Sequence, residues 1–120
     1  MQWKFTGDKP VYQQIMEILR CAVLAGEYPP GSRIEAVREL AMAANVNPNT
    51  MQRALTELER EGLLVCCGTM GRFVTSDQTV LEGAARQSRI EAAQACKARL
   101  EALGLTFAEA ARLLNEEEAT

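Results

Sequence analysis

No stretch of this chain limits its fold as strongly as Asn47-Pro48, which begins an amphipathic segment. Asparagine is a preferred N-cap residue, and proline suits the first helical position, where no backbone N–H is needed. Apolar residues then recur at helical spacing at positions Met51, Ala54, Leu55 and Leu58. The sequence therefore predicts a helix from Pro48 to about Glu61 with one apolar face.

The opposite face of this predicted helix is polar. Its exposed residues are expected to be Asn49, Thr50, Gln52 and Arg53. A helix N-terminus has spare backbone N–H groups that favour phosphate, and these side chains can contact phosphates and base edges. Taken alone, this segment fits a recognition helix that enters a DNA groove and an ordinary capped surface helix about equally well. The surrounding segments decide between them.

The segments around this helix follow the order helix, helix, helix, hairpin. The predicted segments are helices at 10–25, 37–44 and 48–61, strands at 63–67 and 72–75, and a hairpin turn at 68–71. Gly26 suits the end of the first helix, and Arg33-Ile34 is expected to add one short strand. This order is that of a winged helix-turn-helix, a mainly α fold with a small β wing.

The chain changes character after Asp77. An alanine-rich helical stretch is predicted at 79–103, and Thr106 and Glu109 form a capping box for a final helix. That helix is expected to reach about Leu114, with the acidic end fraying.

Two helices of this size cannot bury their apolar faces alone. They must pack on the preceding domain or on another chain, and a second copy is favoured because groove-binding domains of this shape commonly pair on two half-sites. We therefore expect a winged helix-turn-helix domain at 1–77 and a short helical dimerisation tail at 78–120.

Charge does not point to nucleic acid. The net charge is −3 with a pI of about 5.1, and residues 1–77 carry eight Lys/Arg and nine Asp/Glu. A basic patch is the usual electrostatic mark of a DNA-binding protein. Any affinity for DNA must come from the local placement of a few arginines and from helix N-termini.

The composition disfavours catalysis and metal binding. The chain has no histidine, the commonest general base near neutral pH, and no nucleophile elbow or phosphate-binding glycine loop. The cysteines at 21, 66, 67 and 96 form no CxxC pair, so neither a metal site nor a cofactor is expected. We expect them to be reduced, partly buried thiols.

No apolar run approaches the ~18 residues that a membrane span needs. The N-terminus lacks an apolar signal core, so a cytoplasmic protein with no membrane partner is expected. Trp3 and Phe5 are expected to pack on the core or on a partner. Met42, Met51 and Met70 are interpreted as gap-fillers and a loop residue rather than a ligand-binding cluster.

Six stretches in order carry a resemblance to a known family. They are PVYQQI (10–15), GEYPPG (26–31), VRELA (37–41), VNPNTMQRAL (46–55), LEREGL (58–63) and GRFV (71–74). On these residues the chain resembles GntR-family transcriptional regulators of the short, YtrA-like kind. The resemblance covers residues 9–76 closely and the rest by architecture, because YtrA-like regulators carry only a short two-helix tail after the wing.

The resemblance implies a homodimeric repressor that binds an inverted repeat in double-stranded DNA. Such regulators often control transporter operons that include their own gene. Positions similar to DNA-contacting positions of the family are Arg38, Asn47, Asn49, Thr50, Gln52, Arg53, Gly68 and Arg72. Gln52 is similar to a base-reading position, and Gly68 and Arg72 lie at the wing. A small-molecule effector is not identified.

The chain departs from the family at two places. Glu35-Ala36 stands where relatives often have Pro-Ser, so the second helix lacks a capping hydroxyl and gains a negative charge nearby. Cys67 stands where many relatives have arginine before the wing glycine. Both departures predict modest affinity for DNA that depends strongly on salt.

Two alternatives from other classes remain open. One is a redox-sensing regulator in which Cys66 or Cys67 near the wing is the switch. The other is a winged-helix scaffold that binds protein and has lost DNA recognition, which the acidic balance favours slightly. The intact polar face at 49–53 is evidence against the scaffold.

Overall fold

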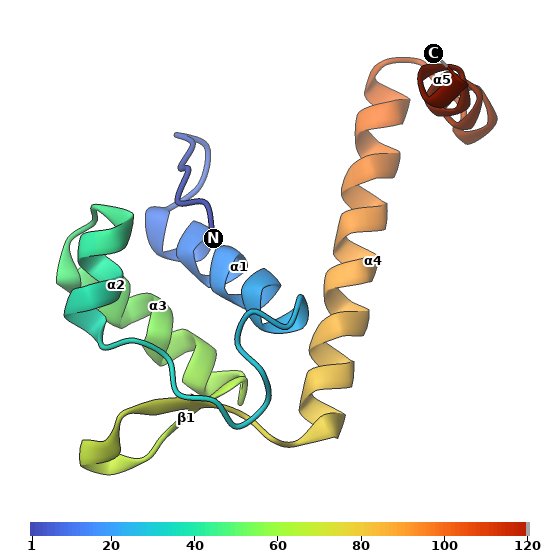
Figure 1. Ribbon diagram of the computed structural model, residues 1–120. Coiled ribbons are helices and arrows are strands. Elements are labelled where there is room, and N and C mark those ends of the chain that lie inside the picture. The colour runs from blue at the N-terminus through green and yellow to red at the C-terminus, as the bar shows by residue number, and fades with distance from the viewer. Residues whose placement is uncertain (120) are drawn as a thin grey trace. The chain divides into compact units, whose positions relative to one another are not determined.

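The structure is a computed structural model that describes residues 1–119, with side chains described as far as residue 116. By its internal contacts the chain divides into two units, Met1–Ala84 and Ala85–Thr120. Its elements are α1 (Val11–Leu24), α2 (Val37–Ala44), α3 (Pro48–Arg60), β1 (Leu64–Cys66), the 3₁₀ turn η1 (Gly68–Met70), β2 (Arg72–Val74), α4 (Gln78–Ala102) and α5 (Phe107–Ala119) (Figure 1). The predicted mainly α fold with a small β wing is confirmed.

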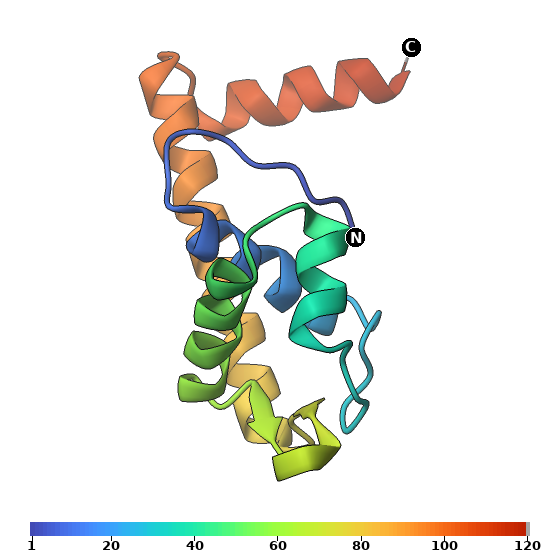
Figure 2. The same ribbon diagram turned by 90° about the vertical axis from the view of Figure 1, so that its left-hand side faces the viewer.

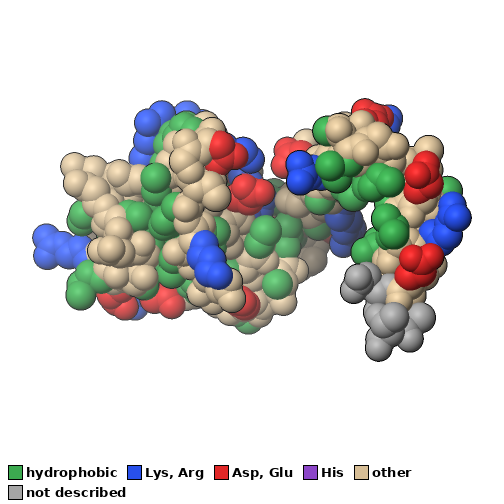
Figure 3. Space-filling model, turned by 90° about the horizontal axis from the view of Figure 1, so that it is seen from above, with side chains coloured by type: hydrophobic (Ala, Val, Ile, Leu, Met, Phe, Trp, Pro, Cys, Tyr) green, Lys and Arg blue, Asp and Glu red, His purple; other side chains and the backbone are tan. Residues whose placement is uncertain are grey.

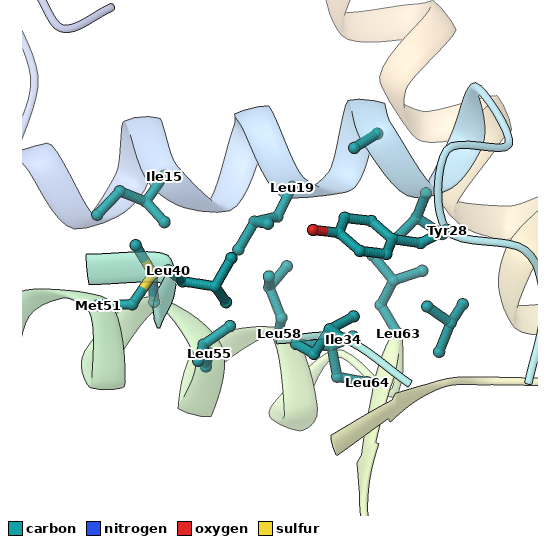
Figure 4. Packing of buried hydrophobic residues seen from close by; sticks show 14 of the residues in the cluster. Ile15, Leu19, Tyr28, Ile34, Leu40, Met51, Leu55, Leu58, Leu63 and Leu64 are labelled. Atoms are coloured by element: carbon teal, nitrogen blue, oxygen red, sulfur yellow. The ribbon is translucent and has the colours of Figure 1, made fainter. Parts of the chain in front are cut away.

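The core of the first unit lies between α1 and α3 and extends to the wing, whose Leu64 and Val74 belong to it. Ile15 and Leu19 on α1 face Met51, Leu55 and Leu58 on α3 (Figure 4). The three α3 residues are 0% exposed, so the apolar face predicted for α3 is its buried face. This packing turns the opposite, polar face of α3 outward.

A short turn sets the angle between α2 and α3. Asn45 ends α2 in the left-handed conformation, with φ 56° and ψ 48°, a conformation that asparagine tolerates better than most residues. The N–H of Val46 then bonds the carbonyl of Ala41 at 3.0 Å. In Figure 2, α2 and α3 lie on the side of the unit that faces the viewer.

The wing is an antiparallel pair in which Leu64 faces Val74 and Cys66 faces Arg72. The predicted short strand at Arg33-Ile34 is present as a single bridge from Arg33 to Phe73. The turn is the 3₁₀ helix η1, closed by a bond of 2.8 Å from the N–H of Cys67 to the carbonyl of Gly71. Both strands are shorter than predicted.

The N-terminal arm is fixed to α1. Trp3 and Phe5 pack against the core, as expected. Gln14 is buried and holds the arm through its side-chain amide, which accepts from the N–H of Thr6 at 2.8 Å and donates to the carbonyl of Lys9 at 2.8 Å. The arm thus leaves a half-buried tryptophan that can report unfolding of this unit.

The second unit contains most of α4 and all of the described part of α5. The predicted capping box is confirmed, with the N–H of Glu109 donating to Oγ1 of Thr106 at 3.1 Å. The expected end of α5 near Leu114 is wrong, because the helix continues to Ala119. Glutamate is a good helix former, and this propensity outweighs its unfavourable interaction with the dipole at a helix C-terminus.

The second unit leaves apolar side chains in solvent. The exposed large apolar residues of this unit are Ile90, Leu103, Phe107, Leu113 and Leu114. No residue of α4 is buried. None of the helices described has the length and apolarity to cross a membrane.

Candidate nucleic-acid interface

The start of α3 is built by Asn47 and Pro48, as predicted. Oδ1 of Asn47 accepts a hydrogen bond of 2.7 Å from the N–H of Asn49, and Pro48 occupies the first helical position. The Asn47 carboxamide oxygen is therefore used by the helix, while its amide nitrogen has no partner within the described part of the chain. A capped N-terminus with an exposed amide is suited to a phosphate.

The outward face of α3 presents the predicted polar residues. Asn49, Gln52 and Arg53 are exposed, and Thr50 is half-buried. Nε2 of Gln52 donates to Oγ1 of Thr56 one turn later at 3.3 Å. This bond restrains the Gln52 side chain along the helix and leaves its carbonyl oxygen free to accept.

Arg38 is exposed on the first turn of α2 and makes no ion pair among the residues described. Glu35, an acidic residue just before α2, accepts a hydrogen bond of 2.5 Å from the hydroxyl of Tyr28. Burial, and then the Glu35 carboxylate, raise the pKa of Tyr28 above its ordinary value. Glu35 is thus held by Tyr28 and leaves Arg38 unpaired.

A hollow of about 360 Å³ lies at the α2–α3 turn. It is lined by Arg38, Ala41, Met42, Asn45, Val46 and Pro48. Met42 is 83% exposed at its rim, so the interpretation of Met42 as a core gap-filler is wrong, whereas Met51 is fully buried. Arg38 and Pro48 both line this hollow, so Arg38 lies close to the N-terminus of α3.

Arg72 on β2 forms an ion pair with α3. Its Nε donates to Oε1 of Glu59. This contact ties β2 to α3 and uses one of the five guanidinium N–H groups. Gly68 is exposed in the wing turn with φ 58°, a conformation that other residues rarely adopt.

Arg33 was not among the predicted site residues. A Cβ built at Gly71 would lie 3.0 Å from Nε of Arg33, so this guanidinium rests on the wing backbone. Arg33 is exposed and forms no ion pair within the described chain. The predicted strand character of Arg33-Ile34, with pairing to the return strand, was the signal that could have placed it at the wing.

The arginines of the first unit fall into two sets. Ion pairs hold three of them, as Arg20–Glu61 at 2.7 Å, Arg60–Glu57 at 3.1 Å, and Arg72–Glu59. Arg33, Arg38 and Arg53 have no acidic partner in the described structure. These three lie at the wing, at α2 and on the outward face of α3. Basic and acidic side chains are interspersed on the face that Figure 3 shows, which is seen from above the view of Figure 1.

The cysteines are exposed and free, so the expectation of partial burial is wrong. Cys66 and Cys67 lie where the hairpin extends past the core, which is why their side chains reach solvent. No group of three or more His, Cys, Asp or Glu residues suited to a metal is present in the described part of the chain.

The second helix begins without a cap. Ala36 occupies the N-cap position with φ −65° and ψ 156° and has no side chain that can accept a hydrogen bond. Because this backbone geometry suits serine, Ala36→Ser is expected to raise the free energy of unfolding by about 1 kcal/mol. Urea unfolding followed by Trp3 fluorescence measures this change. Ala43→Ser, inside the same helix, is the control and should give no gain; equal effects would contradict capping.

Comparison with known proteins gives the relatives of this chain. The family described as bacterial regulatory proteins, gntR family, matches residues 11–74. The chain is 30% identical over 106 residues to the HTH-type transcriptional regulator YhcF of Bacillus subtilis, which covers 88% of each protein. It is 37% identical over 79 residues to the HTH-type transcriptional repressor YtrA of the same organism, covering 64% of this chain and 61% of that protein.

Solved structures agree with these relatives. A GntR family transcriptional regulator from Listeria monocytogenes superposes with a TM-score of 0.83 at 27% identity, over 93% of this chain and 98% of that one. YtrA from Sulfolobus acidocaldarius, a GntR-family transcription factor, superposes with a TM-score of 0.57 over 99% and 97% of the two chains. At 22% identity the second likeness bears on the fold alone.

Proposed function

Since the chain belongs to the gntR family of bacterial regulatory proteins, which are DNA-binding transcription regulators, we propose that it is a homodimeric repressor that binds an inverted-repeat operator. The observation that carries this proposal is the outward face of α3, where Asn49, Gln52 and Arg53 are exposed beside a capped helix N-terminus. Relatives of this chain are regulators rather than enzymes, and the proposed site has no catalytic role.

In the proposed complex α3 enters the major groove. Gln52 reads a base, because a glutamine side chain can bond adenine through two hydrogen bonds. Arg53 contacts a phosphate or a base edge. The remaining proposed phosphate contacts are Arg38, Asn47, Asn49 and Thr50 from the helix-turn-helix, with Arg33, Gly68 and Arg72 at the wing.

The tail supplies the proposed dimer contact. Its exposed apolar residues are unpartnered in the single chain, and exposed apolar patches commonly mark protein interfaces. A groove of about 550 Å³ between Ala93 and Phe107 adds further apolar surface. Two copies would place two α3 helices about one helical turn of DNA apart, or a small multiple of it.

The likeness to the repressor YtrA of Bacillus subtilis supports the proposed repression. On the basis of the family resemblance we also propose that the target is a transporter operon that contains the regulator's own gene. The protein would bind this operon in the cytoplasm. Fluorescence anisotropy tests this with the DNA upstream of the gene and a scrambled fragment, each at about 50 and 200 mM salt. Preference for the native fragment, falling steeply with salt, is expected. Equal binding to both fragments would contradict an operator at this position.

Gln52 and Arg53 are expected to differ in role. Gln52→Ala should relax preference at one or two base pairs, by about 1–3 kcal/mol for the preferred base. Arg53→Ala should weaken binding to all sequences and reduce the salt dependence. Anisotropy on a set of singly substituted operator duplexes separates the two. Arg60→Gln, which removes a charge already paired with Glu57, is the matched control. If Arg53→Ala relaxed the base preference and Gln52→Ala weakened binding to all sequences, the roles assigned to the two residues would have to be exchanged.

A second candidate function is redox control of the same DNA binding. It is favoured by the exposure of Cys66 and Cys67 at the wing. A peroxide would oxidise one thiolate to a sulfenic acid, its O–O bond breaking to release hydroxide, which takes a proton to leave as water. We expect mild peroxide to weaken operator binding in the native protein and to have no effect on Cys66→Ser/Cys67→Ser. Equal binding before and after oxidation would remove this candidate.

A further inference from the structure

Arg53 makes one contact outside its own helix. Its guanidinium carbon Cζ lies 3.8 Å from the centroid of the Tyr12 ring on α1. Tyr12 is half-buried and packs against the core, and its hydroxyl accepts a hydrogen bond of 3.2 Å from Nε2 of Gln13. The ring is therefore held in place by α1 and the core, while the Arg53 side chain that rests on it is exposed.

We propose that Tyr12 is a positioning residue for DNA recognition, which holds the Arg53 guanidinium in the orientation that binds DNA. A cation–π contact uses the flat face of the guanidinium. The five N–H donors lie in the plane of the group, so stacking leaves them free for a phosphate or for the edge of guanine. Tyr12 thus restrains Arg53 without occupying its donors.

The absence of a negative charge on the Tyr12 ring is as important for Arg53 as the position of the ring. The ion-paired arginines of this unit each meet a glutamate, for example Arg60 with Glu57 and Arg72 with Glu59. A carboxylate would neutralise the charge of Arg53 and occupy the guanidinium N–H donors that DNA binding requires. An aromatic face restrains the side chain and preserves its charge. Restricting the Arg53 rotamers before DNA arrives also reduces the conformational entropy lost on binding.

This inference rests on the proposed DNA binding and refines it. An exposed cation–π contact accounts for about a two- to fivefold change in affinity per site. A dimer that contacts two half-sites multiplies the two factors, because distant sites act additively in free energy, which gives about four- to twenty-five-fold. Tyr12→Leu is expected to show this loss, and Tyr12→Phe, which keeps the ring, is expected to bind as the native protein does.

The test is a double-mutant cycle on the full chain. Tyr12→Leu, Arg53→Gln and the double variant are titrated by anisotropy against the DNA upstream of the gene and against a random-sequence duplex at low salt. Arg60→Gln controls for the loss of one charge on α3. We expect Tyr12→Leu to weaken binding and to add nothing once Arg53 is glutamine. Thermal unfolding of each variant confirms that it is folded at the assay temperature.

The outcomes separate the inference from the proposed function. Equal losses from Tyr12→Leu with and without Arg53 would overturn the positioning role, because packing alone would then explain the effect. Native binding by Tyr12→Leu, or by Arg53→Gln, would overturn it as well. Coupling between Tyr12 and Arg53 on the random duplex, without preference for the native fragment, supports the positioning role and contradicts only the proposed operator. Absence of binding to either duplex would overturn both.

Discussion

Replacing Phe107 and Leu114 by glutamate is expected to convert the protein to a monomer and to weaken operator binding by about a hundredfold or more. The two residues are seven apart on α5, so they share one face of the helix, and they are 79% and 67% exposed. Because neither side chain supports the fold of the single chain, the substitutions should leave it intact. In the proposed dimer they place two carboxylates in an apolar contact, where unpaired charges are strongly unfavourable.

Light scattering at micromolar protein measures the oligomeric state, and anisotropy on the native fragment measures the affinity. The control is Arg112→Gln/Asn115→Glu, which changes the charge of α5 by the same amount at two polar, exposed positions. A glutamate variant that remains dimeric would show that this face of α5 lies outside the interface. A monomer with native affinity would show that pairing is not required for DNA binding.

Leu58→Ala is expected to lower the free energy of unfolding by about 2–5 kcal/mol. Leu58 is 0% exposed and lies between α1 and the wing, in the core that orients α3. Shortening its isobutyl side chain to a methyl group loses both the burial of apolar surface and the contacts around the cavity that remains, because packed cores relax only partly.

Urea unfolding monitored by the single tryptophan, Trp3, measures this loss. Comparison at one protein concentration keeps any contribution of self-association constant. Met42→Ala is the control, because Met42 is 83% exposed and a surface change of this kind should stay within about 0.5 kcal/mol. A Leu58→Ala variant as stable as the native protein would contradict the assigned core.

The sequence predicted α3 closely, because two independent signals agreed there. Asn47 and Pro48 marked its start, and the apolar spacing marked its buried face. Periodicity is weaker over short elements. It placed Met51 on the buried face of α3, whereas Met42 on α2 was interpreted as a gap-filler and is exposed. Helix α2 is only two turns long, and its neighbours decide which side is covered.

The contacts of the candidate site could not be predicted from local pattern. Glu35 was expected to add a negative charge near the second helix, and nothing in the sequence indicated that the Tyr28 hydroxyl donates to it. Arg72 was expected at the wing, and its ion pair with Glu59 on α3 was not predicted. Tyr28 and Glu35 lie in the same loop between α1 and α2, and its folded path brings them together. Arg72 and Glu59 lie on different elements, and only packing of the wing on α3 brings them together. The same holds for Tyr12 beneath Arg53.

The separation of the arginines into an ion-paired and an unpaired set affects how strongly the protein binds DNA of arbitrary sequence. Nonspecific affinity for duplex DNA comes almost wholly from cations that neutralise phosphates. With Arg20, Arg60 and Arg72 held by glutamates, few charges remain to retain the protein on arbitrary sequence. Genomic DNA offers millions of competing sites, so occupancy depends on the ratio of specific to nonspecific binding. With the proposed operator as its target, an acidic regulator of this kind is expected to lose few copies to those competitors, so that a small number of molecules would keep the operator occupied.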